Sequence, residues 1–182
     1  MFFLFLYYAL IAYLIYKFLR LDCNPVLAIC DKLWQGKNRL RNKIVWVVGS
    51  STGIGEQLAY QFAELHCKLV LTSTSASKLE QVKAECLRKA KNGLRPDDIL
   101  VLPYDISDFP KSDEAFRTII DRFGKLDVVC LNAARFYGAR VEEDDFAKLK
   151  KLFDINYFAL VYITKLGEHQ VGFFLREKAC LV

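Results

Sequence analysis

The chain has 182 residues, of which 53% are hydrophobic and 26% charged, and it contains no low-complexity tract or internal repeat. This balance predicts one globular α/β core of ordinary size with an additional apolar segment. The net charge of +5 is spread along the chain without a nucleic-acid recognition motif, which argues against a nucleic-acid partner. His66 and His169 are the only histidines, and neither has companions at metal-ligand spacing, so we expect no metal site. The six cysteines include no C-x-x-C pair, and we expect reduced thiols.

The first 20 residues form an apolar segment with no charged side chain before Lys17. As a helix, nineteen residues would reach roughly 28 Å, enough for the thin hydrocarbon core of the endoplasmic reticulum membrane. A cleaved signal peptide is the alternative, but no basic start and no small-x-small cleavage site are present. We therefore expect a single-pass transmembrane anchor over residues 1–20 in contact with lipid. Positive side chains beyond it favour a cytosolic domain, joined by a linker over residues 21–43.

Residues 44–48 form an apolar, β-branched run that predicts a buried parallel strand. A turn with Gly49, Gly53 and Gly55 follows at once and leads into an amphipathic helix. Glycines let the main chain approach a diphosphate, and the helix start offers N–H groups and a positive dipole end. Glu56 and Gln57 stand where a P-loop needs Lys and Ser or Thr, so an ATPase is not expected. A tight turn without a ligand is the alternative.

Strands and helices are expected to alternate along the rest of the chain. This pattern predicts a parallel sheet wound with helices. With right-handed crossovers, the strand order is three-two-one-four, which is the first half of a Rossmann-type doubly wound sheet. We expect this partial domain over residues 44–166. Residues 167–182 would form a tail that diverges in sequence from the domain pattern. The expected strands cover residues 44–48, 68–72, 99–102 and 128–131, and the helices about 76–91, 112–123 and 144–166.

Four motifs in order carry a family resemblance: VVGSSTGIGEQLAYQFA (residues 47–63), DILVLPYDISD (98–108), GKLDVVCLNAA (124–134) and Asn156 within LFDINYFALVYITK. Over about residues 30–166 the chain resembles the short-chain dehydrogenase/reductase family. It is most similar to the membrane-anchored branch that includes family member 7 and the 11-beta-hydroxysteroid dehydrogenases. The resemblance implies an NAD(P)-dependent oxidoreductase that acts on a carbonyl or alcohol of a lipophilic, steroid-like or retinoid-like substrate.

The resemblance also implies which residues hold the nicotinamide cofactor. At the end of the second strand no carboxylate is present to accept from the ribose hydroxyls, and hydroxyl groups with Lys78 nearby favour NADP over NAD. The same serines would equally serve as a helix N-cap. The implied cofactor-binding residues are Gly49, Ser51, Thr52, Gly53, Ile54, Gly55, Ser73, Thr74, Asp105, Ile106, Asn132, Ala133 and Ala134.

Three positions depart from the family pattern. Val48 replaces the usual Thr before the first glycine, which removes a hydroxyl that normally holds the turn. Leu131 and Ala134 replace the first Asn and the Gly of the Asn-Asn-Ala-Gly element. A methyl group at position 134 would crowd the nicotinamide ribose, so we expect a lower cofactor affinity.

Asn156 matches the Asn of the family's catalytic tetrad, although it would equally cap a local distortion of its helix. The tetrad's Ser and Tyr-x-x-x-Lys, which bind the carbonyl oxygen and move its proton, cannot be located in the last expected helix. Tyr157 is followed four residues later by Val161, and Tyr162 precedes Lys165 by only three.

The resemblance ends after Lys165, so we expect a C-terminally truncated member of the family. Its fourth strand would be an exposed edge, and its last helix would lack cover. Two functions remain open. The chain is either an oxidoreductase whose catalytic half is missing, or a non-catalytic, membrane-anchored nucleotide-binding or interaction module. Either form would have a full-length relative or a second copy as its partner.

Overall fold

The computed structural model describes residues 2–19, 40–91, 93–136, 138 and 145–171, and it divides the chain into two units, residues 1–39 and 40–182. In the first unit, α1 spans Phe2–Leu19 and exposes large apolar side chains such as Phe5 and Tyr8. Within the described residues, no helix combines the length and the apolarity needed to cross a membrane. The transmembrane anchor expected over residues 1–20 is therefore not confirmed. The expected linker and tail lie outside the described residues, apart from 40–43 and 167–171.

The second unit contains a four-stranded parallel sheet in the order β3-β2-β1-β4, which confirms the predicted topology. All five residues of β1 are buried, because a strand flanks it on each side and helices cover both faces of the sheet. Val47 of β1 is in register with Leu71 on one side and Cys130 on the other. The strands are β1 Ile44–Val48, β2 Lys68–Ser73, β3 Ile99–Pro103 and β4 Val128–Leu131.

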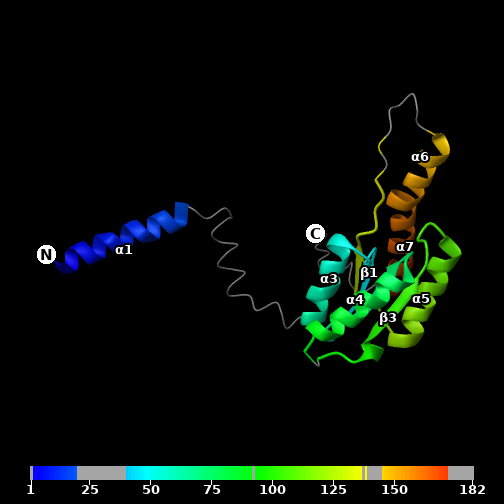
Figure 1. The fold of residues 1–182 in the computed structure, drawn as a ribbon, viewed down its shortest axis with the longest axis horizontal. Coiled ribbons are helices and arrows are strands. Elements are labelled where there is room, and N and C mark those ends of the chain that lie inside the picture. The colour runs from blue at the N-terminus through cyan, green and yellow to red at the C-terminus, as the bar shows by residue number, and fades with distance from the viewer. Residues whose placement is uncertain (1, 20–39, 92, 137, 139–144, 172–182) are drawn as a thin grey trace. The chain divides into compact units, whose positions relative to one another are not determined.

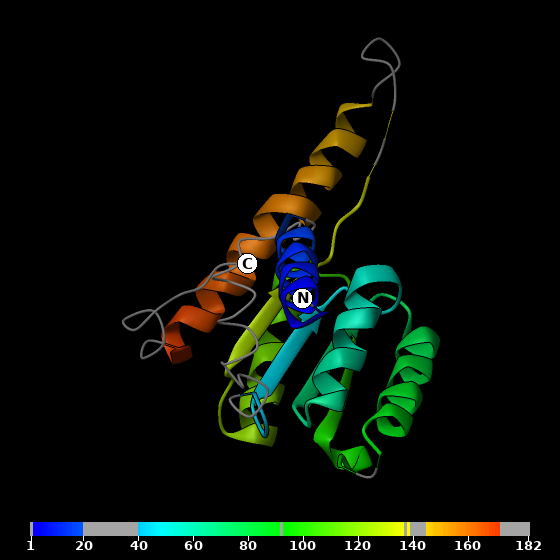
Figure 2. The same cartoon turned by 90° about the vertical axis from the view of Figure 1, so that its left-hand side faces the viewer.

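Helices cover both faces of the sheet, as in a doubly wound fold (Figures 1 and 2). Successive residues of β1 point to opposite faces, so Val45 and Val47 pack in one core and Trp46 and Val48 in the other. The first core is closed by α3 (Gly53–Glu64) and α4 (Ala76–Lys89). The second core is closed by α5 (Phe109–Phe123) and α7 (Ala159–Val171).

The helix expected over residues 144–166 is interrupted. It begins as α6 (Phe146–Phe153), continues as a π-helical segment, Asp154–Phe158, and then becomes α7. Asp145 is the N-cap, and its carboxylate accepts a hydrogen bond from the backbone N–H of Ala147 at 2.9 Å. A π-helical turn contains one residue more than an α-helical turn. The chain therefore departs at this segment from the regular helix that we expected.

Within the described residues, one side of the sheet ends at β4, as predicted. The apolar stripe of the last helix is buried only in its second half. Phe146 is 79% exposed, whereas Ile163 is fully buried against the sheet. The N-terminal end of α6 extends beyond the strands (Figure 2). Large apolar side chains are therefore exposed near the edge and along this helix: Leu131, Phe146, Phe153, Tyr157, Phe158 and Val161.

Candidate cofactor-binding site

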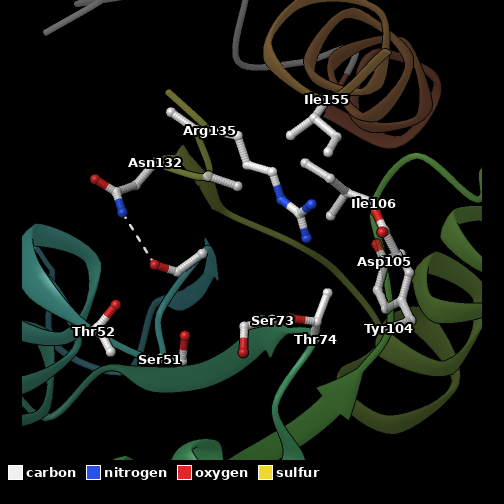
Figure 3. Close-up of a pocket in the computed structure, with 13 residues that line it drawn as sticks. Ser51, Thr52, Ser73, Thr74, Tyr104, Asp105, Ile106, Asn132, Arg135 and Ile155 are labelled. Carbon is white, nitrogen blue, oxygen red and sulfur yellow. Dashed lines mark hydrogen bonds between the residues drawn. The ribbon is translucent and has the colours of Figure 1, made fainter. Parts of the chain in front are cut away.

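A cavity of about 220 Å³ lies at the carboxyl ends of the four strands (Figure 3). Parallel α/β sheets bind their ligands at this end, because the loops there diverge to opposite faces and leave a crevice. The lining combines the glycine turn after β1 with residues at the end of β2, residues that follow β3 and β4, and one residue of the π segment. It consists of Gly49, Ser51, Thr52, Ser73, Thr74, Tyr104, Asp105, Ile106, Asn132, Ala133, Ala134, Arg135 and Ile155.

The turn after β1 is fixed to both neighbouring strands. The backbone N–H groups of Gly49 and Ser50 donate to the carbonyl oxygen of Thr72 at 2.7 and 3.1 Å. On the other side, the Asn132 side chain donates to the carbonyl oxygen of Gly49 at 3.0 Å. These bonds hold the turn even though Val48 lacks the hydroxyl that the family pattern has there.

Two glycines are required because atoms approach the turn closely. Gly49 has a φ of +81°, and a Cβ on it would lie 2.6 Å from the Cα of Ala133. A Cβ on Gly55 would overlap the carbonyl oxygen of Gly49 and lie 2.5 Å from the Asn132 side-chain nitrogen. Gly55 is buried and does not line the cavity. Its contribution is therefore to pack α3 against the turn.

The start of α3 has the features of an anion site. Thr52 is the N-cap residue in an extended conformation, and its side chain makes no capping hydrogen bond among the described residues. The positive end of the helix is thus left without a side-chain cap next to Thr52, which lines the cavity. Gly53 has a φ of +65° and open space around the position of a Cβ. These residues fit a diphosphate, although Gly53 and Ile54 lie outside the cavity lining, and the Ile54 side chain is 73% exposed.

Asp105 supplies a negative charge on the β3 side of the cavity. Its carboxylate accepts hydrogen bonds from the backbone and the hydroxyl of Ser107, at 3.1 and 2.8 Å. Partial burial favours the protonated form of Asp105. The hydrogen bonds from Ser107, together with the positive charges of Arg135 and Lys151, outweigh that effect, so the pKa of Asp105 lies below its usual range. The residue is ionised at neutral pH.

Asn156 lies in the π segment, outside the cavity lining, and its amide pairs with the backbone of Arg135. The Arg135 N–H donates to the side-chain oxygen of Asn156 at 2.8 Å, and the Asn156 side-chain nitrogen donates to the Arg135 carbonyl at 2.7 Å. From the sequence, the alternative role for Asn156 was to cap a local distortion of its helix. Asn156 does lie at such a distortion, the π segment. A role behind an active-site Lys remains a prediction.

The model of the short chain dehydrogenase family matches residues 43–171, which is most of the chain. The chain belongs to the short-chain dehydrogenase/reductase family. It is 38% identical to "Dehydrogenase/reductase SDR family member 7" of Mus musculus over 152 residues, which cover 82% of this chain and 44% of that protein. It is 34% identical to "11-beta-hydroxysteroid dehydrogenase-like 2" of Arabidopsis thaliana, over 67% of this chain and 38% of that protein. The chain therefore spans less than half the length of these relatives.

Solved structures of short-chain dehydrogenases show the same fold. A short chain dehydrogenase from Bacillus anthracis superimposes with a TM-score of 0.66 at 23% identity, over 73% of this chain and 53% of that one. YwfH, described as an NADPH dependent reductase involved in bacilysin biosynthesis, gives a TM-score of 0.64 at 25% identity, over 71% and 53%. In both comparisons, the matched part is about half of the solved structure.

Three lining residues were missed by the family-based prediction: Tyr104, Arg135 and Ile155. Tyr104 directly precedes Asp105, so its place next to the family motif was a usable signal. Arg135 follows directly after Asn132, Ala133 and Ala134, which is the same kind of signal. Ile155 comes from the π segment and had no signal in the sequence. Lys78 does not line the cavity, although it was considered for the NADP preference.

The tyrosines of the last helix lie away from the cavity lining. The Tyr162 hydroxyl donates to the carboxylate of Asp113 on α5 at 2.9 Å, and Tyr157 is 56% exposed. Tyr13 and Lys17 do have the family's four-residue spacing, but they belong to α1 in the first unit. Within the described residues, no tyrosine-lysine pair with this spacing lines the cavity.

Proposed function

We propose that the chain is the nicotinamide-cofactor-binding part of a short-chain dehydrogenase/reductase, with NADP favoured over NAD. The observation that carries the proposal is the cavity at the carboxyl ends of the strands, which most of the predicted cofactor residues line. In this arrangement the diphosphate would lie against Thr52 and Gly53 at the start of α3. The adenosine would lie between Thr74 and Asp105.

The preference for NADP is supported by the residues at the end of β2. Ser73 and Thr74 line the cavity there, and the lining has no carboxylate on that side to accept from ribose hydroxyls. YwfH, a structural relative, is described as NADPH dependent. The bound cofactor would supply the hydride, and the protein would orient it against the substrate.

The substrate class and the location are proposed from the relatives. Because similar proteins are named hydroxysteroid dehydrogenases, we propose that the family protein to which this chain corresponds acts on an alcohol or carbonyl of a lipophilic, steroid-like or retinoid-like molecule. We also propose that the exposed apolar side chains of α1 contact lipid of the endoplasmic reticulum membrane, with residues 40–182 on the cytosolic side.

A second candidate is a non-catalytic nucleotide-binding or interaction module. It is favoured by the lack of a tyrosine-lysine pair in the described lining of the cavity. In this case the exposed β4 edge and the uncovered side of the last helix would bind a full-length relative or a second copy. For this chain alone we expect cofactor binding without turnover.

The test is a calorimetric titration of the full 182-residue chain with NADPH, with carbonyl-dependent NADPH oxidation followed in the same sample. Ser51→Glu places a negative charge in the cavity lining where the diphosphate would lie and should abolish saturable binding. Thr118→Glu adds the same charge on an exposed position of α5 and should leave binding unchanged. Binding without turnover supports the cofactor module. If wild-type chain whose folding is verified by circular dichroism binds no NADPH, the proposal is wrong, and turnover would contradict the non-catalytic alternative.

A further inference from the structure

We propose that Arg135 is the residue that selects the 2′-phosphate of NADP, from the β4 side of the cavity. The inference rests on the proposed cofactor function and assigns its specificity to one side chain. Arg135 follows β4 directly after the Asn132, Ala133 and Ala134 stretch, and it lines the same cavity as Ser73 and Thr74.

The side chain of Arg135 is directed into the cavity. Figure 3 shows its guanidinium pointing toward the side formed by Thr74, Tyr104 and Asp105. In the sheet, β1 separates β4 from β2, so the ends of these two strands lie about 10 Å apart. An arginine has the longest cationic side chain and bridges much of that gap. A phosphate at the end of β2 would therefore face the guanidinium.

The guanidinium is available for a ligand. Among the described residues it has no hydrogen-bond or ion-pair partner in the protein. Its charge acts on Asp105, but the two side chains form no hydrogen bond or ion pair, and Oδ1 of Asp105 accepts two hydrogen bonds from Ser107. A dianionic phosphate matches the planar guanidinium, because two parallel N–H groups can donate to two of its oxygens.

The backbone of Arg135 is held in place by two hydrogen bonds with the Asn156 side chain, one donated by the Arg135 N–H and one accepted by the Arg135 carbonyl. The start of the side chain is therefore fixed, and only its outer part remains to be ordered on binding. Lys78, the other cation near the end of β2, is exposed and lies outside the cavity lining. The structure thus favours Arg135 over Lys78 as the partner of the 2′-phosphate.

Two probes that differ only in the 2′-phosphate, adenosine 2′,5′-bisphosphate and adenosine 5′-monophosphate, test the proposal by calorimetry on the full chain. Wild type should bind the bisphosphate more tightly. Arg135→Gln should weaken bisphosphate binding roughly 10- to 100-fold and leave the monophosphate nearly unchanged. Arg135→Lys keeps the charge but loses the planar pair of donors, so it should lie between wild type and Arg135→Gln. Arg117→Gln removes an exposed arginine on α5, outside the cavity, and should match wild type.

Three results would overturn the inference. One is an equal loss for both probes in Arg135→Gln, because that would make Arg135 a general contact of the adenosine. Another is a loss of the bisphosphate preference in Lys78→Gln but not in Arg135→Gln. The last is a wild-type chain that binds both probes equally, which removes the preference for NADP but leaves the proposed binding of a nicotinamide cofactor standing. If wild type binds neither probe nor NADPH, the proposed function itself fails together with the inference.

Discussion

The side chain of Asn156 forms hydrogen bonds with both backbone groups of Arg135, although the two residues are 21 positions apart in the sequence. This contact joins the π segment of the last helix to the loop that follows β4. It therefore couples the position of the helix to one wall of the cavity.

We expect Asn156→Ala to lower the free energy of unfolding by about 1–3 kcal/mol, because it removes both hydrogen bonds at once. Asn156→Asp keeps the acceptor but turns a carboxylate toward the Arg135 carbonyl, so it should be at least as destabilising. Urea denaturation measures both. Glu168→Ala, an exposed position on α7, is the control and should unfold like wild type. Equal midpoints for Asn156→Ala and wild type would show that the contact contributes nothing to stability.

Gly53 and Gly55 should respond differently to the same substitution. Gly53→Ala puts a methyl group into open space at a positive φ, which costs about 1–2 kcal/mol. Gly55→Ala drives a methyl group into the carbonyl oxygen of Gly49, so we expect a loss of at least about 3 kcal/mol or an unfolded chain. Thermal denaturation followed by circular dichroism ranks the two variants. A Gly55→Ala protein as stable as Gly53→Ala would contradict the packing described for the turn.

Asp127 should stabilise the domain at neutral pH and lose this effect in acid. Partial burial favours its protonated form, but the hydrogen bonds from the Ile44 backbone and from the ammonium groups of Lys43 and Lys125 outweigh burial and lower its pKa. A lowered pKa contributes stability above the unfolded value of about 3.9, and this is lost as the pH falls through the folded value.

Asp127→Asn should therefore cost about 1.5–3 kcal/mol at pH 7, and the difference from wild type should shrink below about pH 4. Urea denaturation at a series of pH values measures this difference in the free energy of unfolding. The exposed Asp121→Asn provides the matched control on α5. A difference that stays constant down to pH 3 would rule out the ionised carboxylate as its source.

Cys67 and Cys86 should react slowly with iodoacetamide in the folded protein. Both side chains are buried, and burial raises the pKa of Cys67 to about 11 and that of Cys86 to about 12. The reactive thiolate is thus rare at pH 7.5. Peptide mass spectrometry should find both sites largely unmodified before unfolding and fully modified in guanidinium chloride. Rapid labelling of either cysteine in folded protein would contradict the burial described for it.

The sheet could be predicted because its signals are local. The continuous apolar runs gave the bounds of β1 and β4 correctly, and crossover handedness gave the strand order. The start of α5 was placed at residue 112, whereas the helix begins at Phe109. Asp108 as the N-cap and Pro110 in the first turn were readable signals for that start.

The π segment and the role of Arg135 could not be predicted in the same way. The spacing of the apolar stripe is the same before and after Asp154–Phe158, so the pattern does not indicate an extra residue, and only the polar Asn156 left a helix distortion open. The place of Arg135 directly after the family motif was a signal for the cavity lining, but its role also depends on a contact with Asn156 that forms only in the folded chain. The cofactor residues predicted from the family motifs do line the cavity in most cases, because they lie within a few residues of a strand end.

The parallel sheet also constrains how the domain reaches its fold. No strand pair can form by a local hairpin, so each pairing must first close a long loop. The hydrogen bond between the side chains of Trp46 on β1 and Thr72 on β2 joins residues that are 26 positions apart. The hydrogen bond between Ile44 at the start of β1 and Asp127 just before β4 joins residues that are 83 positions apart. Pairing of β4 therefore carries the larger entropic cost, and we expect it to be the slower step during refolding. A domain missing β4 would expose β1, whose five residues are all buried in the folded sheet, to other chains until that step is complete.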